Sequence, residues 1–122
     1  MINVLISSES RYKFERGKIR RMVSDFLKEV GLEDVEVSIR VVGARKIKTL
    51  NSDFRKVYEP TDVLSFPQDS VRDPDGILRL GDIVVCYPIC RQEASRENKL
   101  IIDKMNELVE HGLRHLLGEH HD

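Results

Sequence analysis

The chain has 122 residues, which is the length of one ordinary domain, and 40% of them are hydrophobic. Its formal net charge of −1 argues against a strongly basic nucleic-acid binder, so any nucleic-acid site has to be a local patch. The N-terminal apolar run at residues 2–6 is too short for a signal peptide or a membrane span. We therefore expect a cytoplasmic protein with a single domain over residues 1–122, and no membrane partner.

The first half of the chain predicts two strand–helix units. Residues 2–7 form a strand, and residues 13–30 form an amphipathic helix because their apolar positions recur at i, i+3, i+4 and i+7. Residues 35–42 alternate apolar and charged side chains, as a half-buried strand does. A second helix is predicted over residues 44–54. Its inward side chains are expected to be Ile47, Leu50 and Phe54.

The second half of the chain predicts two strands followed by helices. Residues 63–66 form a short strand, residues 73–76 (DPDG) a turn, and residues 80–87 an apolar strand near the centre of the sheet. Pro88 suits the first turn of the next helix, and residues 100–117 form the last helix. This order predicts the α+β class, with one small mixed sheet covered by helices.

The two cysteines, Cys86 and Cys90, are spaced C-x-x-x-C, which is not the spacing of zinc ribbons or of redox sites. We expect both to be buried thiols in a reducing compartment, with no disulfide partner.

All four histidines lie between positions 111 and 121, in the pattern H-x-x-x-H-x-x-G-x-x-H. His111 and His115 are four apart in a helical stretch, so they share one face. Gly118 can adopt a positive φ and end the helix, which would let His121 turn back toward the other two. Three imidazoles with an open fourth position suit a catalytic Zn²⁺. The pattern predicts one Zn²⁺ per chain at the end of the last long helix.

The same histidines are compatible with two simpler arrangements. They could be solvated surface residues, or they could form a closed structural zinc clip. Three imidazoles would also accept another divalent ion.

The metzincin proteases share this histidine spacing, in the form H-E-x-x-H-x-x-G-x-x-H, and the glutamate is their general base. Here Gly112 takes the place of that glutamate, and Glu110 would point to the other side of the helix. A zinc hydrolase or protease of this type is therefore the weaker alternative, because its base is missing.

Four segments follow one another over about residues 50–121: LNSDFR at 50–55, PTDVLSFP at 60–67, LGDIVVC at 80–86 and HGLRHLLGEHH at 111–121. In this order they resemble the motifs of the bacterial YbeY endoribonucleases, also called rRNA maturation factors. The second segment matches in full. The last departs from the family pattern at Arg114 and His120, neither of which is a metal-ligand position. The N-terminal half resembles the family only in its strand–helix pattern.

The resemblance implies a zinc-dependent endoribonuclease that prefers single-stranded RNA. Its implied role is the processing of ribosomal RNA precursors, notably at the 3′ end of the small-subunit (16S) RNA, and ribosome quality control. It assigns His111, His115 and His121 to the metal and Arg55 to catalysis. Zinc and a guanidinium fork can both stabilise the charge that develops on a cleaved phosphodiester. Without the resemblance, Arg55 is better explained as one half of a surface salt bridge.

Four further polar residues are candidates for a supporting role near the metal or the substrate. Thr61, Asp62 and Ser65 could hydrogen-bond a ligating histidine or the RNA, and Asp82 is a second carboxylate that could orient an imidazole. The segment with Thr61, Asp62 and Ser65 could equally be a structural strand between two prolines, and Asp82 could equally cap or brace the sheet.

RNA binding is expected to depend on phosphate contacts, because aromatic residues make up only 6% of the chain and tryptophan is absent. The contacts would come from the strand edge and from two basic clusters, which could also be solvated helix faces: Arg16, Lys18, Arg20 and Arg21, and Arg45, Lys46 and Lys48.

A second hypothesis is a zinc-bound accessory protein that docks on the ribosome or on ribosomal proteins without cutting RNA. Members of the resembled family usually continue beyond the third histidine, whereas this chain ends at Asp122. One wall of the site could then be missing from it.

Overall fold

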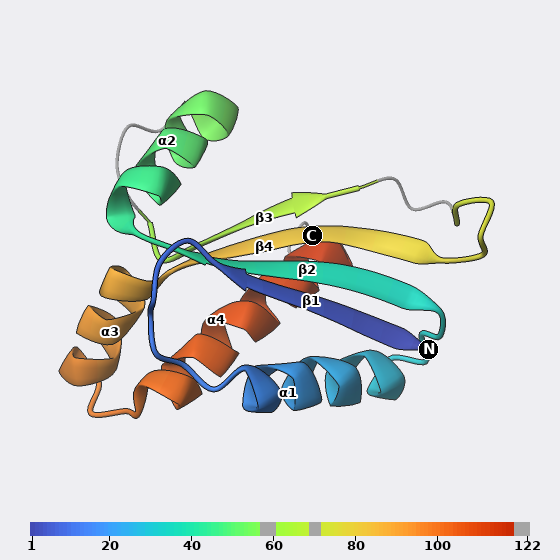
Figure 1. Cartoon of the computed structure of the whole chain (residues 1–122), viewed down its shortest axis with the longest axis horizontal. Helices are drawn as coiled ribbons and strands as arrows, with labels where there is room; N and C mark the ends of the chain where they lie inside the picture. The colour runs from blue at the N-terminus through green and yellow to red at the C-terminus, as the bar shows by residue number, and fades with distance from the viewer. Residues whose placement is uncertain (57–60, 69–71, 119–122) are drawn as a thin grey trace.

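In the computed structural model, the chain forms a four-stranded mixed sheet with helices packed on it (Figure 1). The structure describes residues 1–56, 61–68 and 72–118. The elements in chain order are β1 (Ile2–Ser8), α1 (Arg16–Glu29), β2 (Val35–Val42), α2 (Ala44–Arg55), β3 (Val63–Pro67), β4 (Leu78–Cys86), α3 (Tyr87–Arg96) and α4 (Ile101–Leu116). The predicted α+β class is confirmed.

The strand order is β1-β2-β4-β3. The first three of these strands run parallel, while β3 pairs with β4 in the antiparallel sense and forms an edge of the sheet. Parallel neighbours need a long crossover, which α1 supplies between β1 and β2. The predicted turn at residues 73–76 lies between β3 and β4, where the amide of Gly76 donates to the carbonyl of Asp73 at 2.8 Å.

The main core lies on one face of the sheet, under α1 and α4 (Figure 1). Alternate residues of β2 are fully buried there, as the period of two predicts. The completely buried residues of this core include Ile19, Val23, Leu27, Ile39, Ile83, Met105, Val109 and Leu113. None of the helices in the described part of the chain combines the length and the apolarity that a membrane span requires.

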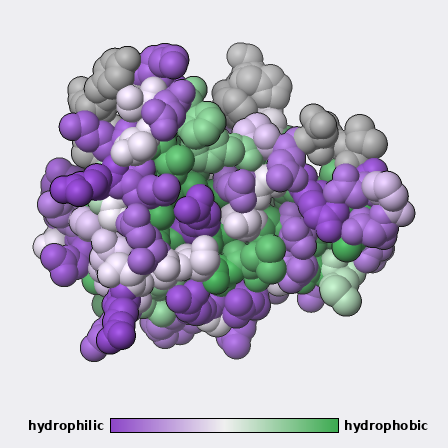
Figure 2. All heavy atoms as spheres, turned by 45° about the horizontal axis from the view of Figure 1, so that its top comes forward, coloured by the Kyte–Doolittle hydropathy of each residue, from purple (hydrophilic) through white to green (hydrophobic). Residues whose placement is uncertain are grey.

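Of the described helices, α2 packs on the opposite face of the sheet, at one end of it. A small second cluster forms there around Ile47, Leu64 and Val84. Leu5 of β1 remains 46% exposed. Figure 2 shows solvent-exposed hydrophobic residues near the middle of the visible face, with hydrophilic residues on either side.

The prediction that Phe54 faces inward is wrong, because its side chain is 66% exposed. Of the residues of α2, Ile47 and Asn51 are the buried ones. The last turn of the helix rises away from the strands (Figure 1). The Phe54 ring packs edge to face on the Phe66 ring, with 5.3 Å between centroids.

Gly81 allows the edge strand β3 to approach β4 closely. The pairing of β2 with β4 shifts register next to it, between Glu36 and Val37. Gly81 has a φ of +135°, and a Cβ atom there would lie 2.2 Å from the carbonyl oxygen of Phe66. The close approach of the two strands therefore explains the glycine of the LGDIVVC segment, because any side chain there would push β3 off the sheet.

Gly81→Ala is expected to lower the free energy of unfolding by about 2–4 kcal/mol, because it adds both backbone strain and a clash with backbone atoms. Gly17→Ala is the control, since a Cβ atom there meets nothing within 4 Å in the first turn of α1. That substitution should be neutral or stabilising by up to about 1 kcal/mol. Urea unfolding measures both, and equal effects would contradict the assigned role of Gly81.

Candidate active site

A cavity of about 440 Å³ opens where the edge strand β3, the C-terminal half of α4 and the end of α2 meet. Its lining residues are Arg55, Thr61, Asp62, Val63, Leu64, Ser65, His111, Gly112 and His115. Candidate residues from three separate segments of the sequence thus come together around one space. Most of the lining residues are polar, while Val63 and Leu64 add apolar surface.

His111 and His115 stand one helical turn apart on α4 and both border the cavity. Their ring centroids are 4.3 Å apart, with the planes inclined by 49°. Two imidazoles so placed can each direct one nitrogen to a shared ion. Among the described residues, no group of three histidine, cysteine or carboxylate side chains is placed to hold a metal ion. Imidazoles are donors that zinc accepts, so His111 and His115 would account for two of the three predicted ligands.

His121, the third predicted ligand, lies outside the described residues. The turn that would lead to it begins as predicted. Helix α4 ends with Leu117 as its C-cap, and Gly118 has a φ of +81°. Its amide donates to the carbonyl of His115 at 3.0 Å. The chain therefore leaves the helix immediately after the two histidines.

Arg55 is the last residue of α2 and reaches the same cavity from the side opposite the main core. The next residue, Lys56, adopts a left-handed conformation with a φ of 59°, which ends the helix. No ion pair joins Arg55 to a carboxylate in the described part of the chain. The surface salt bridge considered as an alternative for Arg55 therefore finds no carboxylate partner among residues 1–56, 61–68 and 72–118.

Thr61, Asp62 and Ser65 all line the cavity, as their candidacy requires. The Thr61 hydroxyl donates to the Asp62 carboxylate at 3.4 Å. The carbonyl of Asp62 accepts a hydrogen bond from the amide of Cys86 at 2.8 Å, which ties the start of β3 to the end of β4.

Asp82 is not brought to the cavity. It pairs with Phe66 in the β3–β4 ladder. Its neighbour Ile83 faces α4, where Gly112 packs on it, so Asp82 projects from the other face of the sheet. The proposed role for Asp82 in orienting a histidine is therefore not supported by the fold.

Gly112 lies between the two histidines at the closest approach of α4 to the sheet. A Cβ atom at this position would lie 2.8 Å from Cγ2 of Ile83, which is completely buried. A glutamate here would force α4 away from β4 and would disrupt the cavity wall. Glu110 instead forms an ion pair with Arg114 at 3.1 Å and borders a different groove. Neither position can supply the base that a metzincin protease needs.

The sequence model of the family described as Endoribonuclease YbeY matches residues 5–122. The chain belongs to this family. The Endoribonuclease YbeY of Alteromonas mediterranea is 41% identical over 97 residues, which cover 78% of this chain and 60% of that relative. The Endoribonuclease YbeY of Aquifex aeolicus is 33% identical over 119 residues, which cover 98% of this chain and 77% of the relative.

The fold is shared with a solved structure as well. The solution structure of TM1509 from Thermotoga maritima superposes with a TM-score of 0.66 at 30% sequence identity. The match covers 94% of this chain and 72% of that chain. The four motifs by which the sequence resembles the YbeY family thus sit on a fold of the same kind, and three of them border the cavity.

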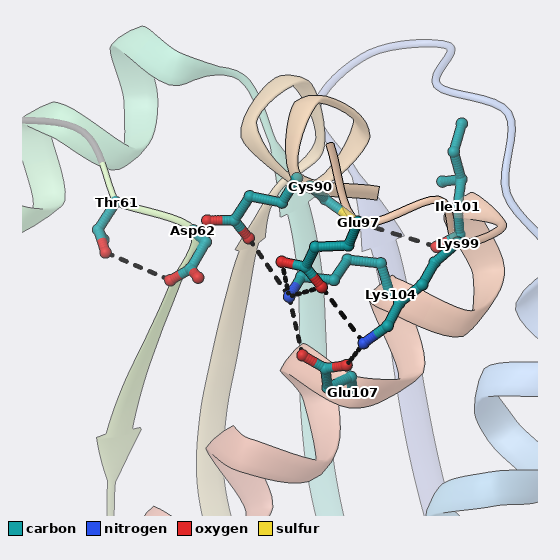
Figure 3. Close-up of polar contacts among 9 residues, drawn as sticks. Thr61, Asp62, Cys90, Glu97, Lys99, Ile101, Lys104 and Glu107 are labelled. Carbon is teal, nitrogen blue, oxygen red and sulfur yellow. Dashed lines mark hydrogen bonds and ion pairs between the residues drawn. The ribbon is translucent and has the colours of Figure 1, made fainter. Parts of the chain in front are cut away.

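A charged cluster behind the cavity was not anticipated from the sequence. Lys104 of α4 is only 6% exposed, and its amine lies 2.8 Å from a Glu107 oxygen and 3.0 Å from Glu97. Glu93 of α3 lies 3.8 Å away. Figure 3 shows this cluster between α3 and α4, with Asp62 on its β3 side. The available signal was a lysine on the apolar stripe of α4, between Ile101 and Leu108.

Lys104→Met should lower the free energy of unfolding by about 2–3 kcal/mol, because it keeps the packed stem but leaves a partly buried group of carboxylates without its cation. Lys99→Met is the matched control. Lys99 contacts the same Glu97 and Glu107 but is 39% exposed, so its loss should cost less than about 1 kcal/mol. Urea unfolding distinguishes the two, and similar losses would show that Lys104 does not brace α3 against α4.

Glu93 connects this cluster to the cavity wall. Burial raises the pKa of its carboxyl group, the negative charge of Asp62 raises the pKa further, and Lys104 opposes both. The folded state therefore binds the Glu93 proton more tightly than the unfolded state does. Protonated Glu93 therefore stabilises the folded state. This stabilisation is fully present below the ordinary pKa of a glutamate, and it is lost as the pH rises through the elevated pKa of Glu93.

Glu93→Gln is accordingly expected to be more stable than the wild type at pH 8, and the difference should narrow as the pH falls toward 4 (about the ordinary glutamate pKa). Glu107→Gln is the control of opposite sign. Its hydrogen bond from Lys104 lowers the pKa of Glu107, so this substitution should destabilise at neutral pH and matter less in acid. Unfolding midpoints across this pH range test both, and a destabilised Glu93→Gln variant at pH 8 would refute the assignment.

The two cysteines are buried free thiols, as predicted. Burial raises the pKa of Cys86, and it raises the pKa of Cys90 to about 12. A buried thiol of raised pKa holds little thiolate at neutral pH, so neither cysteine is activated as a nucleophile.

Proposed function

We propose that this member of the YbeY family is a zinc-dependent endoribonuclease that cuts single-stranded RNA in the cavity between β3, α4 and α2. One observation carries the proposal. An arginine without a carboxylate partner in the described residues and two adjacent imidazoles line the same cavity, although they come from distant segments of the chain. Such a pairing of a cationic fork with metal-type donors suits a phosphodiester.

In this proposal the protein's own residues bind and orient the RNA. Arg55 binds the non-bridging oxygens of the scissile phosphate and stabilises the charge that grows on them. His111, His115 and His121 hold one Zn²⁺, which supplies Lewis acidity and a water of lowered pKa when bound. Thr61, Asp62 and Ser65 offer hydrogen bonds to a histidine or to the ribose.

The basic residues of α2 extend this binding surface. Arg45, Lys46 and Lys48 belong to the helix that carries Arg55. The α1 cluster supports the proposal less well. The Arg16 guanidinium donates to the carbonyl of Ile6 at 3.1 Å, and Lys18 forms an ion pair with Glu15 at 3.3 Å. Phosphate binding by α2 predicts RNA affinity that falls with increasing salt.

The biological substrate that the family resemblance suggests is a ribosomal RNA precursor in the cytoplasm, with cleavage near the 3′ end of the 16S RNA. A role in ribosome quality control and contacts with ribosomal proteins belong to the same proposal. Its support is the set of four motifs together with the family match over residues 5–122.

The decisive test uses three labelled substrates: a single-stranded RNA, the same RNA in a duplex, and casein. The purified protein should cut the single strand, lose that activity on chelation and recover it with Zn²⁺. A protein that binds zinc and RNA without cutting would be the accessory factor considered above. Cleavage of casein would favour the protease, which the missing base at Gly112 argues against.

A further inference from the structure

Phe54 is the one large aromatic ring that stands open to solvent among the described residues. Its side chain is 66% exposed at the last turn of α2. The ring meets Phe66 at an interplanar angle of 67°, so it is held at one side and remains accessible over much of its surface. An exposed ring of this size has no role in the core described above.

The position of this ring relative to the cavity is what makes it informative. Phe54 directly precedes Arg55, which lines the cavity with His111 and His115. Consecutive residues on a helix project about 100° apart, so the ring flanks the guanidinium and does not cover it. Lys56 follows at the exposed, left-handed end of the helix. An aromatic ring and an amine thus flank, in sequence, the one residue of α2 that lines the cavity.

This succession matches the chemistry of an unpaired nucleotide. Its phosphate suits the guanidinium, and its base presents a flat π-face that can stack on an aromatic ring. Bases inside a duplex have both faces covered by their neighbours, so they cannot use such a platform. Phosphate contacts alone would not distinguish paired from unpaired RNA.

We propose that Phe54 is a base-stacking residue that binds the unpaired nucleobase beside the phosphate held by Arg55, and that it contributes the preference for single strands. This inference rests on the proposed endoribonuclease function. It also adds a base contact to the phosphate contacts on which RNA binding is expected to depend.

The test is a cycle that combines a substitution in the protein with a deletion in the RNA. Cleavage of a single-stranded oligonucleotide is compared with that of oligonucleotides carrying one abasic site at each position around the cut. For the wild type, one abasic position should lower kcat/KM about tenfold, mainly through KM. Phe54→Leu should lower kcat/KM for the intact RNA by a similar factor, and that abasic site should then cost almost nothing further.

Two control variants accompany the cycle. Phe54→Trp keeps a stacking surface and should retain the abasic penalty. Leu100→Ala removes another exposed apolar side chain, which is 68% exposed at the start of α4. It should leave kcat/KM unchanged for both the intact and the abasic RNA. Independent, additive penalties for Phe54→Leu and the abasic site would overturn the stacking role, as would equal kcat/KM values for Phe54→Leu and the wild type.

A binding measurement separates this inference from the nuclease proposal. When 2-aminopurine is placed at each RNA position in turn, at least one position should change its fluorescence on binding the wild type but not on binding Phe54→Leu. If the wild type shows this change yet cuts no RNA, the nuclease proposal fails and the stacking site stands. If the wild type cuts RNA and shows no such change at any position, the stacking site fails alone.

Discussion

Arg55→Ala is expected to lower kcat for RNA cleavage by about 10²–10³-fold, the usual cost of removing a preorganised donor from a developing oxyanion. Arg55 is the only arginine or lysine among the described residues that line the cavity, so no other described cation there can replace its guanidinium. Zinc content and the urea unfolding midpoint should stay close to those of the wild type, since the side chain is exposed. Single-turnover cleavage, with metal analysis of the same samples, measures the effect.

The control for Arg55 is on the same helix. Arg45→Ala removes a guanidinium near the start of α2, and it should weaken RNA binding by a small factor without changing kcat. Arg55→Lys should recover only part of the activity, because an ammonium group cannot bind two phosphate oxygens as a fork. Full activity in Arg55→Ala would remove this residue from the mechanism.

His115→Ala is expected to abolish measurable cleavage and to weaken zinc binding by at least about 10²-fold, because a catalytic zinc site needs all three of its protein ligands. The side chain borders the cavity next to His111, with the two ring centroids 4.3 Å apart. The fold should survive, since the core of α4 is formed by other residues such as Met105 and Val109.

His120→Ala is the matched control for this loss, as the family resemblance leaves His120 outside the ligand set. It should retain both zinc and cleavage. If His115→Ala and His120→Ala lost zinc to the same extent, the ligand assignment by spacing would be mistaken.

The parts of the site that the sequence predicts are those set by local periodicity. A spacing of four places His111 and His115 on one helical face, and Gly118 ends the helix at the expected point. The strand and helix order follows from hydrophobic patterns over whole elements, which explains why the α+β class and the mixed sheet were predictable.

Features that depend on tertiary geometry were not predictable in this way. Phe54 continues the apolar spacing of α2, but whether the last turn meets the sheet depends on the tilt of the helix. Asp82 belongs to the same motif as Gly81, yet the pleat places it on the face away from α4. The cluster around Lys104 joins two helices whose packing no single motif specifies. The position of His121 remains a prediction.

The catalytic role of the metal can be measured by titrating the metal-free protein with Co²⁺ and following visible absorption and RNA cleavage in the same samples. If the three histidines hold one catalytic ion, the titration should saturate at one equivalent, with absorption typical of a tetrahedral site. The cleavage rate should rise in proportion to occupancy, and His111→Ala should show neither the absorption nor the activity. Cleavage that persists at full strength without bound metal, or that survives in His111→Ala, would contradict a catalytic metal site on α4.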